Sequence, residues 1–454
     1  MNASKKKTFS KQTIILCFLS LLCLLFPLLY VVHVNGVKSI FGYDDLHRLT
    51  SIQHKQGATV LSQFQYALSA DGKRNTLQEY LKYPAGQTVT SVSRTVFYGY
   101  DNAGRLNAEQ RQSTSMLAAG GTIQNTARTL WAYDKVGNRL TQSVSNYDGI
   151  GIDAPSVLKS TFNTNYNYNN NDWLTSTTSM KHDDSGESTF VTNFEHNANG
   201  SQSAVTTNVG TSDEKKTPYF YDFEQKLTNV GTPTDTVKHA YAYDADDNRI
   251  MESNNSASGM DVRNYLVDPN NSYAQVVEEY NNGSILLSHY DWNESELLRE
   301  ANLNEDTSTF VIHQPLADAQ NSMRQLLDGS GAISDVYAFD AWGNQQEAFG
   351  GAFNPYRYNM QRLDVNGLYY LRERQYASGL GRFISQDLFE GVEDEPVTLH
   401  HYLYCGGDPI ILLIQMAVIQ YGSTMCFMVA LNSLNPFWRQ QPSIQEIKKL
   451  LLNG

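Results

Sequence analysis

Hydrophobic and polar positions alternate along much of the chain, which is the pattern of strands with two different faces. Val96, Tyr98 and Tyr100 occupy every second position of one such stretch, and Tyr241 and Tyr243 do so in another. Each stretch ends in Tyr-Asp, followed by a turn and then by a polar or basic residue and an aliphatic one. We therefore expect hairpins whose tyrosines share one face of a strand.

This Tyr-Asp unit recurs loosely between Ile40 and Ile250. Its clear copies begin at Tyr43-Asp44, Tyr100-Asp101, Tyr133-Asp134, Tyr221-Asp222 and Tyr243-Asp244, with weaker ones at Tyr168-Asn169 and Phe194-Glu195 and a late one at Phe339-Asp340. Asp at the first and Gly at the fourth position, as in Asp101 and Gly104, is typical of a type I turn. A lone hairpin is marginally stable, so the units must stack into one continuous sheet. The chain is predicted to be all-β.

The first 36 residues have a different pattern. Four lysines precede the run from Thr13 to Val34, which is apolar and contains no charged residue. A basic flank followed by an apolar helix is typical of a signal peptide, and the run is also long enough for an uncleaved signal anchor. Both interpretations stay open. Either places the rest of the chain outside the cytoplasm, as a secreted or cell-surface protein that uses the export machinery or an N-terminal membrane segment.

Composition supports the strand assignment and excludes some functions. The chain has 28 Tyr and 31 Gly, and only 18% of its residues are charged. A net charge of -13 argues against nonspecific nucleic-acid binding. No Cys/His metal pattern is present, and Asp246-Asp247-Asn248 lacks the other ligands of a calcium loop. We predict no metal and no cofactor.

The stretch from Arg357 to Asp387 concentrates tyrosines, arginines and glycines around two acids, Asp364 and Asp387. Asn366-Gly367 is a strong hairpin signal, and the residues that follow it have the composition of a buried strand. Two interpretations of the acids remain open. They form ion pairs that hold hairpins together, or they form a dyad that shares a proton and activates water.

The same stretch resembles the core-associated region of RHS repeat (YD repeat) proteins, a family that includes the C components of insecticidal toxin complexes. The matching positions are Arg357-Tyr358, Asp364, Gly367-Leu368-Tyr369-Tyr370, Arg374, Tyr376, Gly381-Arg382-Phe383 and Asp387, followed by the segment from Tyr402 to Pro409. The Tyr-Asp units resemble the repeats of that family in a more variable form. Where the family usually has Pro after the second acid, this chain has Leu388.

The resemblance implies a spiral sheet or partial hollow shell that encloses a C-terminal segment. It further implies aspartyl autoproteolysis by Asp364 and Asp387, with Arg357 as a supporting cation and a cut between Asp387 and Asp408. The expected regions are a signal or anchor (1–36), repeats (37–264), a repeat continuation (265–356), the core region (357–409) and a variable hydrophobic tail (410–454).

The function expected on this basis is encapsulation or delivery of a C-terminal effector in a toxin or intercellular competition system, with toxin-complex or secretion proteins as partners. An alternative is a cell-surface adhesion protein without catalysis, whose tyrosines contact glycans. A truncated remnant of an RHS protein is a further alternative.

Overall fold

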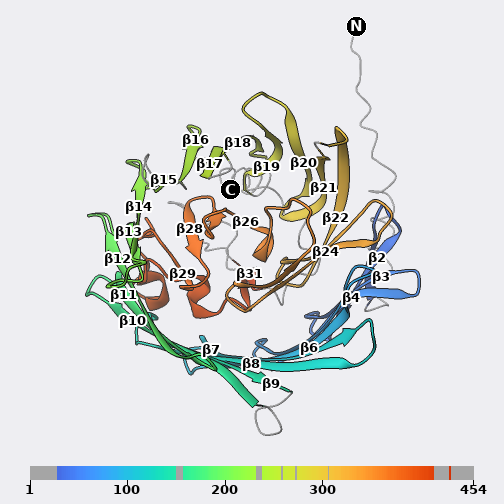
Figure 1. Cartoon of the computed structure of the whole chain (residues 1–454), viewed down its shortest axis with the longest axis horizontal. Helices are drawn as coiled ribbons and strands as arrows, with labels where there is room; N and C mark the ends of the chain where they lie inside the picture. Colours follow the sequence, from blue (N-terminus) through green and yellow to red (C-terminus); the bar gives the residue numbers. More distant parts are fainter. Residues whose placement is uncertain are drawn as a thin grey trace, which may run out of the picture.

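The computed structural model describes residues 28–149, 157–231, 238–256, 259–270, 273–304, 306–413 and 429–430. Its main element is a sheet of 25 strands, in which each strand pairs antiparallel with the next along the chain. In Figure 1 the strands of this sheet up to β22 follow one another around a ring, while β24, β26, β28 and β29 lie within it. The predicted all-β fold is confirmed.

The strands of this sheet are β1 (Leu28–Val32), β2 (Val37–Tyr43), β3 (Leu49–Gln56), β4 (Thr59–Leu68), β5 (Arg74–Lys82), β6 (Val89–Tyr100), β7 (Leu106–Leu117), β8 (Thr122–Tyr133), β9 (Arg139–Asp148), β10 (Val157–Tyr168), β11 (Leu174–Asp183), β12 (Gly186–His196), β13 (Gln202–Thr207), β14 (Lys215–Tyr221), β15 (Leu227–Val230), β16 (Lys238–Tyr243), β17 (Arg249–Ser256), β18 (Gly259–Asp268), β19 (Gln275–Tyr280), β20 (Leu286–Asn293), β21 (Glu296–Asn304), β22 (Thr309–Ala317), β23 (Met323–Leu327), β24 (Ile333–Phe339) and β25 (Gln345–Phe349).

A second sheet consists of the short strands β26 (Arg362–Leu363), β27 (Tyr369–Leu371), β28 (Arg374–Ala377) and β29 (Arg382–Phe383). Three 3-10 turns, η1 (Tyr358–Met360), η2 (Pro396–Leu399) and η3 (Cys405–Gly407), and the pair β30 (Leu412–Leu413) and β31 (Val429–Ala430) complete the described elements. The described ranges contain no helix that is long and apolar enough to cross a membrane.

The predicted N-terminal apolar helix lies mostly outside the described residues. Its last part is described and forms strand β1, so the prediction of a helix is wrong there. Tyr30 lies opposite Ile40 of β2 in this pair. Aromatic and β-branched residues such as Tyr30, Val31 and Val32 suit a strand, and the edge of β2 offers them hydrogen-bonding partners.

The Tyr-Asp units close hairpins through one recurring turn. In the turn that begins at Asp101, the Asp101 amide donates to Arg105 O (2.9 Å) and Gly104 donates to Asp101 O (2.9 Å). The Asp101 carboxylate accepts from the amides of Ala103 and Arg105, both at 2.9 Å. Gly104 has φ +82°, so the turn is a type I turn followed by a bulge. Turns with the same backbone pairing begin at Asp44, Ser69, Asn169, Asn197, Asp222, Asp244, Asn281, Asp318, Asp328, Asp340 and Asp364. In the turn at Asp134 the Gly137 amide donates to the Asp134 carboxylate at 2.8 Å.

The tyrosine before the turn links its hairpin to the preceding one. Tyr133 donates a hydrogen bond to Leu106 O (2.6 Å), and Leu106 follows directly after the Asp101 turn. Tyr243 makes the same contact with Leu227 O (2.8 Å), just after the preceding turn. Tyr100, Tyr133 and Tyr243 belong to β6, β8 and β16 of one sheet, as the repeat pattern predicted.

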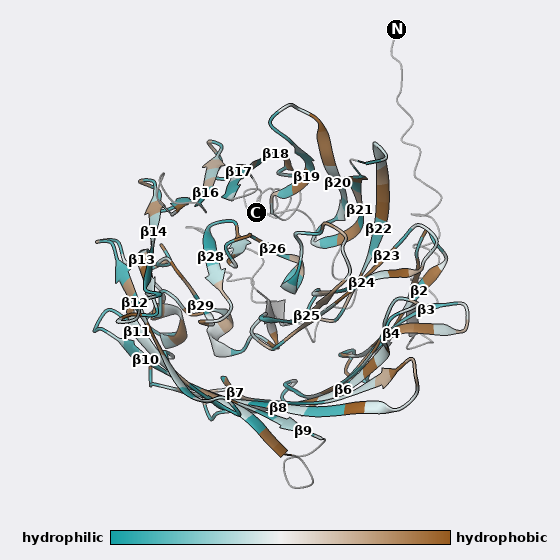
Figure 2. Ribbon diagram, viewed as in Figure 1, coloured by the Kyte–Doolittle hydropathy of each residue, from teal (hydrophilic) through white to brown (hydrophobic). Residues whose placement is uncertain are grey.

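Hydrophilic and hydrophobic residues are interspersed along the strands of the ring (Figure 2).

The inner face of the sheet is covered by the C-terminal part of the chain. Phe64 and Leu77 pack with Val336 of β24, and Leu106 packs with Trp342 and other residues after β24. Further around the ring, Leu227 and Tyr241 pack with Leu368 and Ile384. Over these strands the C-terminal part of the chain therefore packs against the inner face of the sheet.

Candidate functional site: the charged interior around Asp364

The hairpin that carries Asp364 has the backbone of the outer turns but uses its side chains differently. Asp364 N donates to Leu368 O, and Gly367 adopts φ +84°, so the hairpin predicted at Asn366-Gly367 is confirmed. Here Asn366 Oδ1 accepts from the Leu368 amide at 3.1 Å. Because Asn366 takes part in capping the turn, the Asp364 carboxylate can point away from it.

The Asp364 carboxylate binds the guanidinium of Arg249 from β17. Arg249 donates from both terminal nitrogens, to Oδ2 at 2.7 Å and to Oδ1 at 2.8 Å. The two side chains are 0% and 1% exposed. The guanidinium also lies between the rings of Tyr370 (3.9 Å) and Tyr241 (4.9 Å). Two-point pairing of this kind is typical of an ionised carboxylate.

Burial raises the pKa of Asp364 above its ordinary value. Arg249 opposes this shift by favouring the charged form, while the like charge of Glu252 reinforces it. Asp364 therefore lies in an environment that favours proton uptake more than a surface aspartate does.

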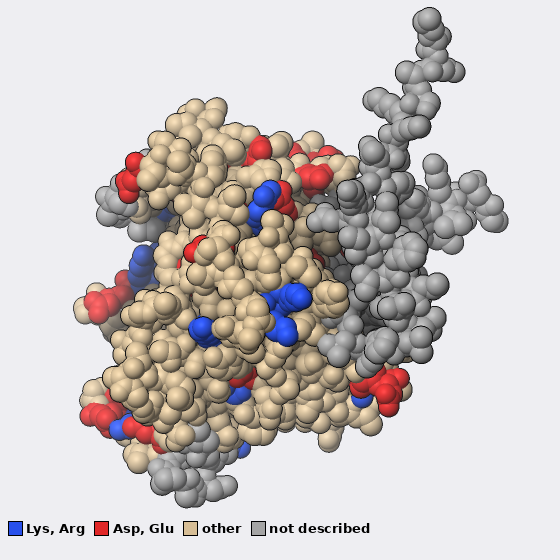
Figure 3. All heavy atoms as spheres, turned by 90° about the vertical axis from the view of Figure 1, so that its right-hand side faces the viewer, with Lys and Arg blue, Asp and Glu red and all other residues tan. Residues whose placement is uncertain are grey.

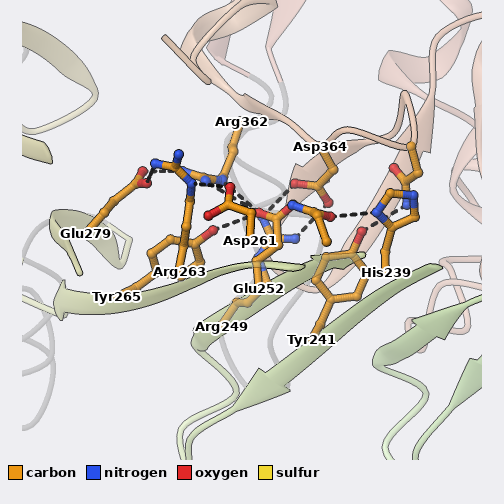
Figure 4. A network of polar contacts seen from close by, with 12 residues as sticks. His239, Tyr241, Arg249, Glu252, Asp261, Arg263, Tyr265, Glu279, Arg362 and Asp364 are labelled. Atoms are coloured by element: carbon orange, nitrogen blue, oxygen red, sulfur yellow. Dashed lines mark hydrogen bonds and ion pairs between the residues drawn. The ribbon is translucent and has the colours of Figure 1, made fainter. Parts of the chain in front are cut away.

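Glu252 connects Asp364 to a longer network that crosses the inner face of β17 to β19 (Figure 4). Glu252 Oε2 accepts from Tyr265 at 2.7 Å and lies 3.4 Å from Arg362 NH2. Arg362 also donates to Glu279 at 2.6 Å, and Glu279 accepts from Arg263 at 3.0 Å. Burial alone would raise the pKa of Glu252, but Arg362 and Arg249 lower it to about 2. Arg362 and Arg249 therefore hold Glu252 in its charged form.

Asp387 belongs to a different ion pair. Its Oδ2 lies 2.6 Å from Arg374 NH2, and its Oδ1 accepts from the Phe389 amide at 3.0 Å. Arg374 also donates to His401 O at 3.0 Å. The structure thus pairs Asp364 and Asp387 with two different arginines, which is the ion-pair arrangement that the sequence left open.

Arg357 lies apart from both acids. Its guanidinium sits 4.3 Å from the centre of the Tyr337 ring, and it donates to Tyr356 O at 3.1 Å. The acid that it influences is Glu300. Burial raises the pKa of Glu300 well above its ordinary value, and Arg357 partly offsets that rise. Among the described residues, Arg357 forms no ion pair with Asp364 or Asp387.

Sequence reasoning missed a second buried network, beneath β5 and β6. Glu79 lies 2.5 Å from Arg94 NH1 and 2.8 Å from Arg324 NH2. Burial would raise the pKa of Glu79, but Arg324 and Arg94 lower it to about 2. A usable signal was present, because Leu77, Glu79 and Leu81 share one strand face and the glutamate stands among apolar residues.

The charged side chains thus have two settings. On the face shown in Figure 3, they occur in small groups among uncharged residues. In the interior, acids and arginines pair out of contact with water. Such an arrangement can hold strands in register and can place an acid of raised pKa beside a second acid. Within the described ranges, no group of His, Cys, Asp and Glu side chains has the geometry to hold a metal ion.

No protein-family model and no curated protein matches the chain. Among solved structures, it is similar to the crystal structure of TcdB2-TccC3-Cdc42 (TM-score 0.37, 13% identity) and to that of TcdB2-TccC3 (TM-score 0.37, 14% identity), each over 86% of this chain and 27% of the other. It is also similar to the Photorhabdus luminescens Tc holotoxin pore (TM-score 0.36, 14% identity), over 88% of this chain and 27% of the other. The chain spans about a quarter of the length of these structures. The family resemblance read from the motifs stays a prediction.

Proposed function

We propose that this protein is an RHS-type shell whose curved sheet encloses the start of its own C-terminal segment and delivers that segment. One observation carries the proposal: the residues at the start of the tail lie buried inside the curved sheet. Ile410 is 0% exposed and belongs to the same cluster as Leu106 and Trp342. Pro409 O accepts hydrogen bonds from Gln320 at 2.7 Å and from Tyr358 at 3.2 Å.

In this proposal each region has a role. Residues 37–264 and 265–356 form the wall, and residues 357–409 form a plug that anchors the tail. Residues 410–454 are the delivered segment, and residues 1–36 direct export or anchor the chain in a membrane. Toxin-complex or secretion proteins would be its partners in a toxin or intercellular competition system.

Site-specific proteolysis tests the enclosure. A recognition sequence for a specific protease is inserted after Ser433 in the tail and, in a control variant, between Gly120 and Gly121, an open turn of the sheet. An enclosed site is cut only when the protein opens, so we expect the tail site to be cut at least about tenfold more slowly than the control site. Both sites should be cut equally in denatured protein. Equal rates in the native protein would contradict the proposal.

We propose further that Asp364 and Asp387, with Arg357 in support, act as an aspartyl dyad that cuts between Asp387 and Asp408. The support is the raised pKa of Asp364 beside the charge of Glu252. The dyad requires the two acids to leave their separate arginines and meet. Mass spectrometry of the purified protein at mildly acidic pH tests this mechanism. Fragments ending within 387–408 should form and should disappear in Asp387→Asn.

A groove on the outside of β4 to β7 favours a second function, adhesion to cell-surface glycans. It has a volume of about 420 Å³, within the range of small-ligand sites. Its lining includes Gln63, Gln65, Gln78, Tyr80, Ser93, Thr95, Gln112 and Thr114. Glu79 and Arg94 also contribute, but their charged groups pair with each other at 2.5 Å. Amides, hydroxyls and an aromatic ring suit a neutral sugar.

A glycan array tests this second function. Binding should be lost in the double variant Gln78→Ala and Tyr80→Ala and should persist in Asp387→Asn, which leaves the groove unchanged. An absence of binding by the intact protein would contradict it.

A further inference from the structure

The first and last parts of the large sheet meet at a seam that contains no strand pairing. At this seam β2 to β4 lie beside β22 to β24 (Figure 1), yet among the described residues each strand of the sheet pairs only with its neighbours along the chain. Side chains bridge the seam instead. Gln325 donates to Leu61 O at 3.1 Å and to Lys82 O at 2.8 Å, and the Ala319 amide donates to the Tyr66 hydroxyl at 3.0 Å. The seam is therefore closed by separate contacts of single side chains.

One of these bridges is a chain of hydrogen bonds centred on Ser39 of β2. Ser39 Oγ lies 2.6 Å from His33 Nε2 and 2.7 Å from His54 Nδ1. His54 of β3 lies opposite Ser39 in the sheet, and its Nε2 lies 3.0 Å from the carbonyl oxygen of Ala317, the last residue of β22. Ser39 and His54 are only 2% and 4% exposed. The chain thus connects the first turn of the sheet to the end of β22 through a buried imidazole.

The chemistry of these groups gives the chain a direction. The Ala317 oxygen can only accept, so His54 Nε2 carries a hydrogen. In an uncharged ring Nδ1 then has a lone pair and accepts from the Ser39 hydroxyl, whose oxygen in turn accepts from His33. A proton on His54 Nδ1 would reverse the bond with Ser39 and would place a positive charge inside the seam.

Burial opposes that charge. It lowers the pKa of His54 to about 4, against the bond to Ala317 O, which favours the charged form. His33 lowers the pKa of His54 further, and burial lowers the pKa of His33 as well. Both imidazoles are therefore uncharged in the closed seam at neutral pH.

The neighbouring groups supply no counter-charge. On the side of β4, the Phe64 ring packs edge-on against His54, with 6.3 Å between the ring centres. On the side of β22, the first acid is Asp318, and its carboxylate pairs with Arg324 at 2.9 Å. Lys38 and Lys55 adjoin Ser39 and His54 in sequence and point to the opposite face, because side chains alternate along a strand. Among the described residues, no carboxylate forms an ion pair with His54.

We propose that His54 is an acid-sensitive latch, which holds the first hairpins against β22 while it is uncharged and releases them when it takes up a proton. A buried charge without a partner is costly, and release lets the charged ring reach water. The contribution of the latch is complete above pH 6.5, the ordinary pKa of histidine, and is lost as the pH falls towards 4.

The opening should start at one place. Arg324 also pairs with Glu79 of β5 at 2.8 Å. Because the pKa of Glu79 is about 2, this ion pair persists at a pH that charges His54. Acid should therefore free β2 and β3 while β5 stays in contact with β23. This inference goes beyond the proposed function, since it concerns closure of the sheet and holds whether or not the tail is delivered.

Hydrogen exchange of the Ala319 amide in the full-length chain measures the opening, because this amide donates across the seam to Tyr66. Each rate is divided by that of an unprotected amide at the same pH, which removes the effect of pH on the exchange chemistry. Protection should fall at least about tenfold from pH 6 to pH 4, since released His54 binds a proton more tightly. It should change less than about twofold between pH 7.5 and pH 7.

The variant His54→Gln separates the latch from other effects of acid. The glutamine side chain can accept from Ser39 and donate to Ala317 O, but it takes up no proton in this pH range. The acid-dependent loss of Ala319 protection should therefore disappear. In His54→Leu both hydrogen bonds are absent, so protection should already be lower than in the natural chain at pH 7.

His239→Gln is the matched control. His239 is also a buried histidine of the sheet, and its Nδ1 lies 2.6 Å from Asn254 Oδ1. It belongs to β16, away from the seam. This variant should keep the full acid-dependent loss of Ala319 protection.

A second measurement uses the natural chain alone and does not depend on how any variant folds. Nuclear magnetic resonance of the His54 ring should show the hydrogen on Nε2 at neutral pH and a titration midpoint near pH 4. A midpoint near 6.5, or an equal loss of Ala319 protection in the natural chain and in His54→Gln, would overturn the inference. None of these results bears on the enclosure of the tail, which site-specific proteolysis at neutral pH tests separately.

Discussion

The turns at Asp101 and Asp364 share a backbone and differ in what their carboxylates do. Asp101 accepts from two amides of its own turn and pairs with Arg105, four residues on, at 2.7 Å, with both side chains partly exposed. In the Asp364 turn, Asn366 accepts the hydrogen bond from the Leu368 amide. The Asp364 carboxylate instead binds Arg249, 115 residues away, and both side chains are buried. One sequence signal, an acid that opens a hairpin, thus serves a local turn in the sheet and a long-range ion pair in the interior.

The difference shows where the two regions obtain their stability. The outer turns rest on local hydrogen bonds, whose net contributions are small and are lost one at a time. The interior hairpins are short strands held by ion pairs that cannot be replaced by water. Breaking one partner should therefore cost far more in the interior than in the outer turns.

Removal of Arg249 should have the largest effect. In Arg249→Met the Asp364 carboxylate stays buried without a partner, so the free energy of unfolding should fall by about 3–5 kcal/mol. Arg48→Met is the matched outer change, since Arg48 pairs with Asp44 at 2.7 Å near the surface, and it should cost less than about 1 kcal/mol. Urea denaturation measures both.

A double variant sharpens this result. Arg249→Met combined with Asp364→Leu removes both charges, so it should be more stable than Arg249→Met alone. Equal losses for Arg249→Met and Arg48→Met would contradict the distinction between interior and outer turns.

Acid should weaken the ion pairs of Glu252 in the interior. The pKa of Glu252 is about 2 in the folded protein, below the ordinary value of about 4.3. Its contribution is therefore complete above pH 4.3 and is lost as the pH falls towards 2, with a total on the order of 3 kcal/mol. In Glu252→Gln the slope of unfolding free energy against pH should be shallower between pH 4.5 and 3. An unchanged slope would show that the Glu252 pKa is not lowered.

The raised pKa of Asp364 acts in the opposite direction. Its folded form binds a proton more readily than its unfolded form, so this group favours folding more as the pH falls. Although Asp364 and Glu252 lie in one network, variants at the two positions should change the pH dependence of the free energy of unfolding in opposite directions.

Two turn glycines differ in the space around them, and here the crowded one lies in a turn of the large sheet. Gly343 and Gly367 have φ +88° and +84°. A Cβ on Gly343 would lie 2.6 Å from the buried Tyr358 ring, whereas one on Gly367 would meet no atom within 4 Å. Gly367→Ala should cost about 1 kcal/mol from backbone strain alone. Gly343→Ala should cost about 2 kcal/mol more from overpacking. Thermal unfolding measures the loss of stability in each variant. Equal losses would contradict the close approach of the Tyr358 ring to Gly343.

The smallest effect is expected from the tyrosine links between hairpins. Tyr133→Phe removes one hydroxyl that donates to Leu106 O, so it should lower stability by about 1 kcal/mol. Chemical denaturation measures this loss, and Tyr30→Phe, at an exposed edge position, is a control. A loss larger than that of Arg249→Met would reverse the ranking of the two regions.

The sequence predicted the features that depend on neighbours in the chain. Asp101 and Gly104 signalled the recurring turn, and Asn366-Gly367 signalled the hairpin before β27, because local geometry decides which residues fit. It could not identify Arg249 as the partner of Asp364. That contact depends on how far the sheet curves before the chain returns, and no local pattern encodes the curvature. For the same reason the interior networks of Glu79 and Glu252 were missed.

The central claim is that the sheet encloses the short hairpins of residues 357–409. Hydrogen exchange of individual amides tests it most directly. Phe383 N donates to Tyr402 O and Ile384 N donates to Gln375 O, both at 3.1 Å, next to strands of two to four residues. If these hairpins are enclosed, both amides exchange only on global unfolding, and more slowly than those of Thr189 and Phe190 in the longer, exposed strand β12. Faster exchange at Phe383 and Ile384 than in β12 would contradict the account.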